Sequence, residues 1–208
     1  MVDLKTLWSA RSDWFNPEGR EQRIKDYMFL TNQLVWKRQA SFLAVAVLAA
    51  VYYDPVWALF CYMLVSVGEF LDQRLGRQSE AWDGKDPVLG RAILIRIAVN
   101  TVFTATAISV FIVSIAIQQT TGWHFTPLFF LFSAALFAAM YNSQMIAILA
   151  LRLSIYGAAF LFIALLDVVR FRPPLNSHVW LEFFTITLVL YFVADTSLKF
   201  YLGYQKEG

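Results

Sequence analysis

The sequence predicts an all-α, polytopic membrane protein with six transmembrane helices. Of its 208 residues, 59% are hydrophobic and only 15% are charged, and the mean hydropathy is +0.55. A soluble domain would carry about a quarter of charged residues. The apolar residues also lie in long runs without an amphipathic stripe. Such a chain cannot cover an aqueous surface, whereas a bilayer supplies apolar contact on all sides.

Six apolar runs reach or approach the roughly 20 residues that a helix needs to cross about 30 Å of hydrocarbon. Turn-forming sequences separate the runs, among them Asp54-Pro55, Thr121-Gly122 and Arg172-Pro173-Pro174. The first two runs, and the fourth and fifth, are joined so closely that we expect antiparallel hairpins, although the joint at 142–144 leaves a kinked double span as an alternative. The runs cover residues 39–53, 56–71, 92–117, 125–141, 145–166 and 179–201.

The chain divides into a cytoplasmic lead (residues 1–38), a membrane domain of six helices (39–204) and a short cytoplasmic end (205–208). The lead mixes Trp8, Trp14 and Tyr27 with basic residues. This composition suits a helix lying along the anionic inner leaflet of the membrane, with a disordered tail as the alternative. No apolar signal segment opens the lead, so the first span is expected to act as its own insertion signal.

The distribution of Lys and Arg predicts the orientation. With six spans, the lead, the loop between the second and third runs and the chain end fall on one side, and only Arg170 and Arg172 fall on the other. Both termini are therefore expected in the cytoplasm, in a bacterial cytoplasmic membrane. The net charge of +2 does not indicate a nucleic-acid partner. The basic residues of the first side are Lys5, Arg11, Arg20, Arg23, Lys25, Lys37, Arg38, Arg74, Arg77, Lys85, Arg91, Lys199 and Lys206.

Ionisable side chains inside apolar runs are costly, so they are the candidate functional residues. At about 1.5 Å of rise per residue, Glu69 and Arg96 lie at matched depth on neighbouring predicted helices, and we expect an intramembrane ion pair between them. Arg152 is expected to meet Asp195 in the same way. The predicted ligand-binding or coupling set is Asn100, Thr101, Thr104, Arg152 and Asp195.

The alternative interpretation is structural. In that case the charges hold helices together, Arg96 extends to the head groups, and Asp195 pairs with Lys199 four residues later on its own helix.

No catalytic residue and no metal site are predicted, because no Ser-His-Asp arrangement, glycine-rich phosphate loop or HExxH motif occurs. The single cysteine, Cys61, excludes an intrachain disulfide or a thiolate cluster. The sequence does not identify a cofactor, and a pigment, a quinone or a haem remain open. The segment from Asp195 to Lys199 resembles the last helix of microbial rhodopsins, which implies retinal on the lysine, but those proteins have seven spans.

The overall plan resembles the N-terminal membrane sensor region of bacterial histidine kinases and related signalling proteins. The residues that carry it are the basic lead through Lys37-Arg38, the hairpin at Asp54-Pro55 and the exit at 198–207. The resemblance implies a sensory module that binds a ligand or partner within the membrane, forms a homo-oligomer or joins other membrane subunits, and continues its last helix into the cytoplasm. The phosphoacceptor helix and the ATP-binding domain of that family are not among the 208 residues.

A second class of function is left open beside the sensor. The polar residues inside the predicted spans and the short chain also suit a small transporter or channel, or an accessory subunit of a larger membrane assembly.

Overall fold

The computed structural model describes residues 20–119, 124–142, 144–174 and 177–207, and these residues form helices joined by short links, without a strand. The all-α prediction is confirmed. Each of the six apolar runs corresponds to one helix, with Tyr53 and Met145 at two run ends lying just outside α3 and α7 as cap residues. One further helix among the described residues, α2, precedes them. The helices are α2 (Arg20–Gln33), α3 (Val35–Tyr52), α4 (Pro55–Glu80), α5 (Pro87–Gln118), α6 (Phe125–Tyr141), α7 (Ile146–Phe171) and α8 (His178–Glu207).

Four of these helices, α4, α5, α7 and α8, are long and apolar enough to cross a membrane. A fifth span is added if α2 and α3, which meet at an angle of 49°, are counted as one broken span. Helix α6 is apolar but has only 17 residues. Four to five helices of spanning length and composition are thus present in the described part of the chain.

Two Asp-Pro steps start the helices that follow them. Asp54 precedes α4, and its Oδ1 accepts hydrogen bonds from the backbone amides of Val56 and Trp57 at 2.9 and 3.2 Å. Asp86 caps α5 in the same way. In each case the proline occupies the first helical turn, where its missing amide hydrogen costs nothing. The first step makes α3 and α4 a tight hairpin, as predicted.

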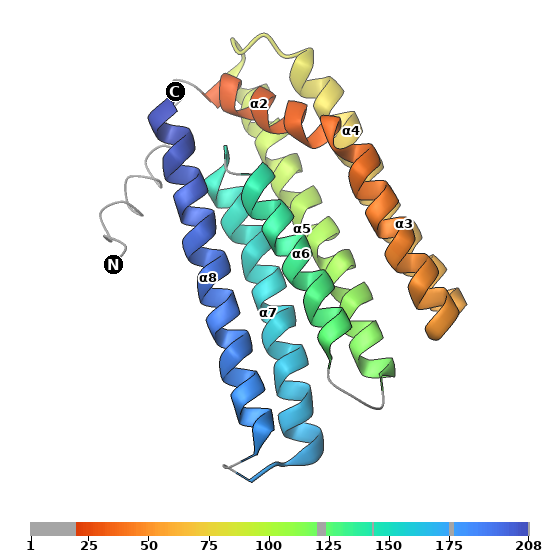
Figure 1. Cartoon of the computed structure of the whole chain (residues 1–208). Helices are drawn as coiled ribbons and strands as arrows, with labels where there is room; N and C mark the ends of the chain where they lie inside the picture. Colours follow the sequence, from red (N-terminus) through yellow and green to blue (C-terminus); the bar gives the residue numbers. More distant parts are fainter. Residues whose placement is uncertain (1–19, 120–123, 143, 175–176, 208) are drawn as a thin grey trace.

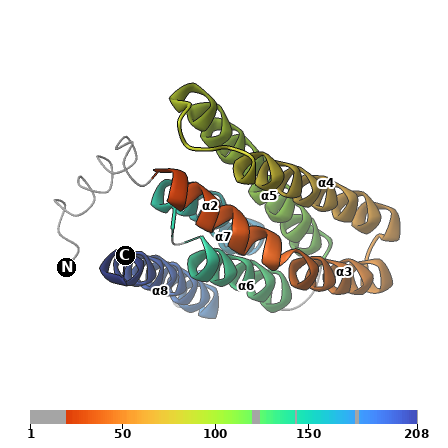
Figure 2. The same ribbon diagram turned by 90° about the horizontal axis from the view of Figure 1, so that it is seen from above.

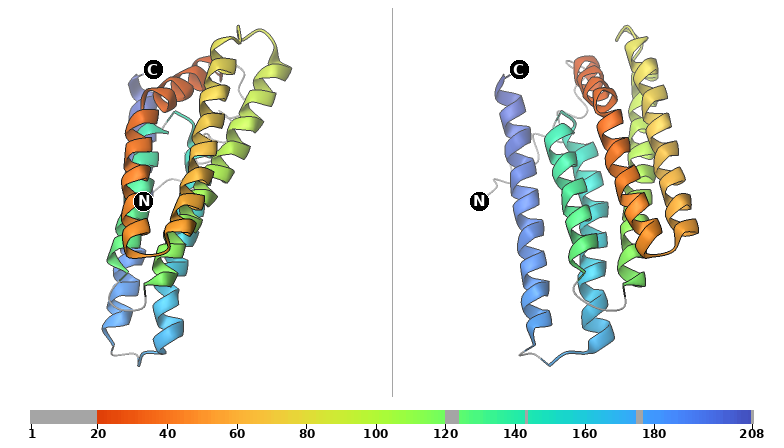
Figure 3. Two further views of the ribbon diagram at one scale, coloured as in Figure 1. Left: turned by 90° about the vertical axis from the view of Figure 1, so that its right-hand side faces the viewer. Right: turned by 45° about the vertical axis from the view of Figure 1, so that its right-hand side comes forward.

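The long helices run roughly alongside one another (Figure 1). Helix α5 contacts α4, α6 and α7, while α3 packs on α4, and α8 packs on α6 and α7. In the right-hand view of Figure 3, α8 lies at one side, α6 and α7 in the middle, and α3 and α4 at the other side. The predicted hairpin of α6 and α7 is present, since the two contact each other and run in opposite directions.

Helix α2 crosses one end of the bundle, at the same end as the α4–α5 loop and the C-terminal end of α8 (Figures 1 and 2). Its Ile24, Tyr27 and Met28 are buried and belong to one core cluster with residues of α4, α5 and α7. A side chain at Gly76 of α4 would overlap the amide of Asn32, so this glycine allows the close approach of α2. The first 19 residues of the predicted lead lie outside the described residues.

Helix α8 continues without a break from His178 to Glu207. Its backbone therefore remains helical past Lys199, which confirms the predicted continuous last helix. An unpaired backbone amide in hydrocarbon costs several kcal/mol, so the threonines and the serine within α8 do not interrupt it.

Candidate functional site

A polar cluster lies inside the bundle near the end that α2 covers. We define it as Arg38 of α3, Glu69 and Asp72 of α4, Asn100 of α5 and Arg152 of α7. Arg38 donates two hydrogen bonds to Oε2 of Glu69, from Nε at 3.2 Å and from Nη2 at 2.6 Å. Their side chains are only 15% and 4% exposed, respectively. The ion pair therefore ties α3 to α4 away from solvent.

Asp72 and Asn100 form the second half of the polar cluster. The Asn100 amide donates to Oδ1 of Asp72 at 2.5 Å and to the backbone carbonyl of Gly68 at 3.0 Å. The hydroxyl of Thr104 donates to the carbonyl of Asn100 at 2.7 Å, on the same helix. A Cβ atom at Gly68 would lie 2.7 Å from Oγ1 of Thr104, so the glycine is what allows α4 and α5 to approach this closely.

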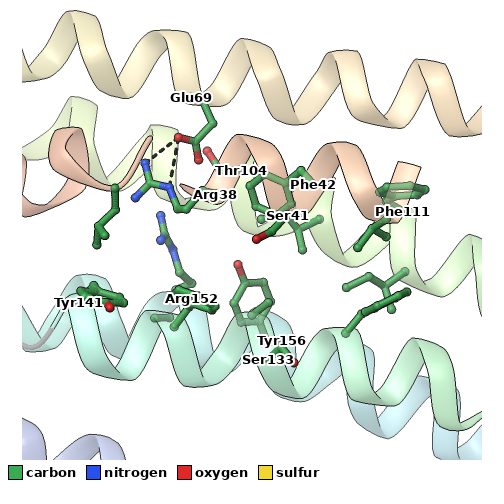
Figure 4. Close-up of a pocket in the computed structure, with 18 of the residues that line it drawn as sticks. Arg38, Ser41, Phe42, Glu69, Thr104, Phe111, Ser133, Tyr141, Arg152 and Tyr156 are labelled. Carbon is green, nitrogen blue, oxygen red and sulfur yellow. Dashed lines mark hydrogen bonds and ion pairs between the residues drawn. The ribbon is translucent and has the colours of Figure 1, made fainter. Parts of the chain in front are cut away.

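Arg152 differs from the other charged members of the polar cluster. Its Nε is buried without a hydrogen-bond partner, and the side chain forms no ion pair within the described residues. Figure 4 shows its guanidinium extending toward Arg38 and Glu69. Tyr156 follows one helical turn later, and its hydroxyl points into the same space (Figure 4). Arg152 is therefore a charged donor that faces a cavity.

The cavity has a volume of about 420 Å³ and lies between α3 and α6, with residues of α4, α5 and α7 completing the wall. Arg38, Glu69 and Arg152 gather at one end, and Phe111 lies toward the other (Figure 4). Most of the remaining wall is apolar, with residues such as Phe42, Val45, Ile108, Ile112, Phe130 and Ala134. The cavity thus combines a charged end with a long apolar part.

The cavity also reaches the protein surface. Ser41, Ala44 and Leu48 of α3 and Phe137 of α6 line it and are at the same time exposed, Leu48 by 48% and Phe137 by 44%. No described residue pair brings α3 and α6 into extensive contact. The opening therefore lies between these two helices, along their apolar length.

The predicted pair of Glu69 and Arg96 does not form. Glu69 is paired with Arg38, and Arg96 is exposed and donates to Oε1 of Gln78 at 3.0 Å. Arg96 lines a separate groove between α4 and α5, together with Arg74. The physical reason is the helical face: on α5, Asn100 and Ile97 turn inward, which places Arg96 on the outer side.

The predicted meeting of Arg152 with Asp195 is also wrong. Asp195 forms an ion pair at 2.5 Å with Lys199 on its own helix, with side-chain exposures of 31% and 73%. No described side chain of α8 lines the cavity. The alternative interpretation, in which Asp195 pairs with Lys199 on its own helix, is therefore the one that is observed, and Lys199 lies at the surface.

The other predicted site residues are buried near the polar cluster. Asn100 belongs to the cluster, Thr104 lines the cavity, and Thr101 is buried beside Asn100 in α5. Of the predicted set, Asn100, Thr101, Thr104 and Arg152 thus lie in one region, whereas Asp195 lies elsewhere.

Sequence reasoning missed Arg38, Asp72 and Tyr156. Arg38 was assigned to the basic lead, yet it shares a helical face with Phe42 and Val45, which line the cavity at intervals of three to four residues. Asp72 lies three residues after Glu69, and Tyr156 lies four residues after Arg152, so each shares the face of a predicted site residue. This spacing was the available signal.

Among the described residues, no three His, Cys, Asp or Glu side chains gather to hold a metal ion. Arg170 near the end of α7 donates hydrogen bonds to the backbone carbonyls of Ile117 and Gln119. No family model, no curated protein and no solved structure matches this chain. The proposal for the function therefore rests on the geometry of the polar cluster and its cavity.

Proposed function

We propose that the chain is a membrane-embedded sensory module. A ligand binds within the bilayer in the cavity between α3 and α6, and α8 carries the resulting displacement to the cytoplasmic side. The observation that carries this proposal is Arg152, whose buried Nε lacks a partner and whose guanidinium faces the cavity. A charged donor without an acceptor is costly at this depth, and such residues mark functional sites in membrane proteins.

The proposal includes six spans with both termini in the cytoplasm. Helices α3 and α6, of 18 and 17 residues, are about 27 and 26 Å long at 1.5 Å per residue, close to the roughly 30 Å of the hydrocarbon core. Arg74, Arg77, Lys85 and Arg91 belong to the α4–α5 end of the bundle, where α2 and the end of α8 also lie. The positive-inside rule supports a cytoplasmic location for that end.

The helix contacts give a route from the cavity to the exit of the chain. Helices α6 and α7 provide one wall of the cavity, and α8 packs on both of them. A ligand that separates α6 from α3 therefore acts on the two helices that hold α8. Helix shifts of about 1–2 Å are enough to carry such a signal. Because α8 is continuous to Glu207, it is suited to act as a lever.

The test fills the cavity without requiring a known ligand. In a Cys61→Ala background, spin labels at Lys85→Cys and Lys199→Cys, both highly exposed positions, report the distance between the α4–α5 loop and α8 in nanodiscs. Ala134→Trp, on the cavity wall, is expected to shift that distance distribution. Met140→Trp, on the same helix but exposed and away from the cavity, is the matched control and is expected to leave it unchanged.

Two results decide against this function. An unchanged distance distribution in Ala134→Trp contradicts coupling between the cavity and α8. Proteoliposomes of the wild-type chain are also assayed for ion or solute flux. Flux that Ala134→Trp abolishes and Met140→Trp retains supports a transporter or channel instead of a sensor.

A further inference from the structure

We infer that the cavity binds a single-chain amphiphile whose head group carries one negative charge, and that this molecule reaches it from the bilayer between α3 and α6. The inference rests on the proposed ligand-binding function and names the class of ligand. Its head group accepts hydrogen bonds from Arg152, and its chain lies along the apolar part of the cavity.

The charges on the cavity wall favour an anion. The wall carries two guanidinium groups, of Arg38 and Arg152, and one carboxylate, of Glu69, which leaves a formal excess of one positive charge. Arg38 is already bonded to Glu69 through both Nε and Nη2. The excess therefore resides on Arg152. A bound anion would supply the missing acceptor in a region of low dielectric constant, where a charged hydrogen bond is strong.

Asp72 balances the charge of the polar cluster as a whole but does not replace this anion. It does not line the cavity, its Oδ1 accepts from Asn100, and it forms no ion pair within the described residues. The side of Arg152 that faces the cavity is therefore left without an acceptor from the described part of the chain.

The same wall favours a head group with a single negative charge. Glu69 lies at the charged end of the cavity, and its carboxylate would repel a second negative charge on the ligand. A carboxylate or a phosphodiester carries one charge, and either can accept two parallel hydrogen bonds from a guanidinium group. The hydroxyl of Tyr156, which points into the cavity, is a further donor near Arg152.

The rest of the cavity favours one apolar chain. A volume of about 420 Å³ lies within the range of roughly 300–1,000 Å³ that holds one small molecule. The wall beyond the charged end is built mainly from aliphatic and aromatic side chains. The exposed wall residues Ala44, Leu48 and Phe137 place the opening on an apolar face of the bundle, where bilayer lipids are the neighbouring molecules in the proposed topology. A water-soluble ligand would have to cross that apolar face.

The test measures binding of radiolabelled oleate to the full purified chain in phosphatidylcholine nanodiscs. The wild type is expected to bind oleate, and Arg152→Gln is expected to bind it about ten- to a hundredfold more weakly, the loss of one charged hydrogen bond. Arg152→Lys keeps the charge and is expected to lose less. Asp195→Asn, far from the cavity, is the matched control and is expected to bind as the wild type does.

A second variant covers the case in which Arg152→Gln fails to fold, as judged by circular dichroism and gel filtration. Ala134→Trp keeps every charged group and is expected to abolish oleate binding by occupying the cavity. Oleate binding that is unchanged in Ala134→Trp, or unchanged in a folded Arg152→Gln, overturns the inference.

Competitors separate the possible sources of the ligand. Uncharged oleyl alcohol is expected not to displace oleate, and equal displacement by the alcohol overturns the requirement for a negative charge. If phosphatidylglycerol binds in an Arg152-dependent manner and oleate does not bind, the single-chain assignment is overturned in favour of a phospholipid. A shift of α8 in Ala134→Trp without any oleate binding removes this ligand class and leaves the sensing proposal standing.

Discussion

Arg38 and Glu69 are joined by two hydrogen bonds that end on the same carboxylate oxygen, at 3.2 and 2.6 Å. The bonds link α3 to α4, at the charged end of the cavity. Glu69 is nearly buried, so Arg38 is the group that makes its negative charge tolerable there. The pair thus joins two walls of the cavity and leaves Arg152 as the charged wall residue without an ion-pair partner among the described residues.

Arg38→Gln is expected to destabilise the fold strongly, by roughly 3–5 kcal/mol, because it leaves the Glu69 carboxylate buried and unpaired. The double variant Arg38→Gln/Glu69→Gln is expected to be closer to the wild type, since no uncompensated charge remains. Unfolding in mixed micelles measures both. Equal losses of unfolding free energy in the single and the double variant would show that Arg38 does not stabilise the Glu69 carboxylate.

Gly68→Ala is expected to cost about 1–3 kcal/mol through overpacking, because its Cβ would lie 2.7 Å from Oγ1 of Thr104. Thr104→Ala in the same chain is expected to restore part of the loss. Gly157→Ala is the matched control, since nothing lies within 4 Å of its Cβ position, and it is expected to be neutral or to stabilise α7 by about 0.5–1 kcal/mol. Thermal unfolding in detergent distinguishes them, and similar losses in Gly68→Ala and Gly157→Ala would refute the close packing of α4 and α5.

Asn100→Leu and Asp195→Asn are expected to differ sharply. The first removes the donor to Oδ1 of Asp72 and leaves that buried carboxylate without this hydrogen bond, while the Gly68 carbonyl keeps its backbone bond within α4. The expected cost is roughly 2–3 kcal/mol. The second removes a partly exposed ion pair on α8, and no measurable change in the midpoint of thermal unfolding is expected. Equal sensitivity of the two positions would mean that Asp195 has a buried partner after all.

Cysteine labelling tests the orientation in a Cys61→Ala background, which removes the buried native thiol. In intact cells, a membrane-impermeant maleimide is expected to label Pro174→Cys in the α7–α8 loop and to spare Lys85→Cys in the α4–α5 loop. Permeabilised cells are expected to label both and provide the control for accessibility. Labelling of both positions in intact cells would contradict the six-span topology.

The helices could be predicted from the sequence because long apolar runs and turn chemistry mark them directly. The predicted run 125–141 coincides with α6, and the Asp54-Pro55 step is the start of α4. Other helices extend beyond their apolar runs, as α4 does to Glu80, since a helix can continue with polar residues outside the hydrocarbon. The sequence did not reveal that α2, for which a position along the membrane surface was predicted, also packs on the bundle through the buried Ile24, Tyr27 and Met28.

The pairing of the charges could not be predicted, because the depth of a residue along its helix does not specify which neighbouring helix its side chain faces. Glu69 and Arg96 were placed at the same depth on consecutive helices, but α5 is apolar around most of its circumference, so the sequence does not reveal which face turns inward. Glu69 instead faces α3, the preceding helix. The predicted pair of Arg152 and Asp195 was wrong for the same reason, because the face of α8 that carries Asp195 turns away from the cavity.

The 49° bend between α2 and α3 lies directly beside Leu34 and Arg38 of the cavity wall. Arg38 lies in the first turn of α3, directly after the bend, and α2 is held against α4 by buried side chains and by the close approach at Gly76. Because only Leu34 separates the two helices, a displacement of α2 is expected to move the start of α3, and with it Arg38. If the cavity holds a ligand as proposed, its occupancy and the position of α2 are expected to depend on each other.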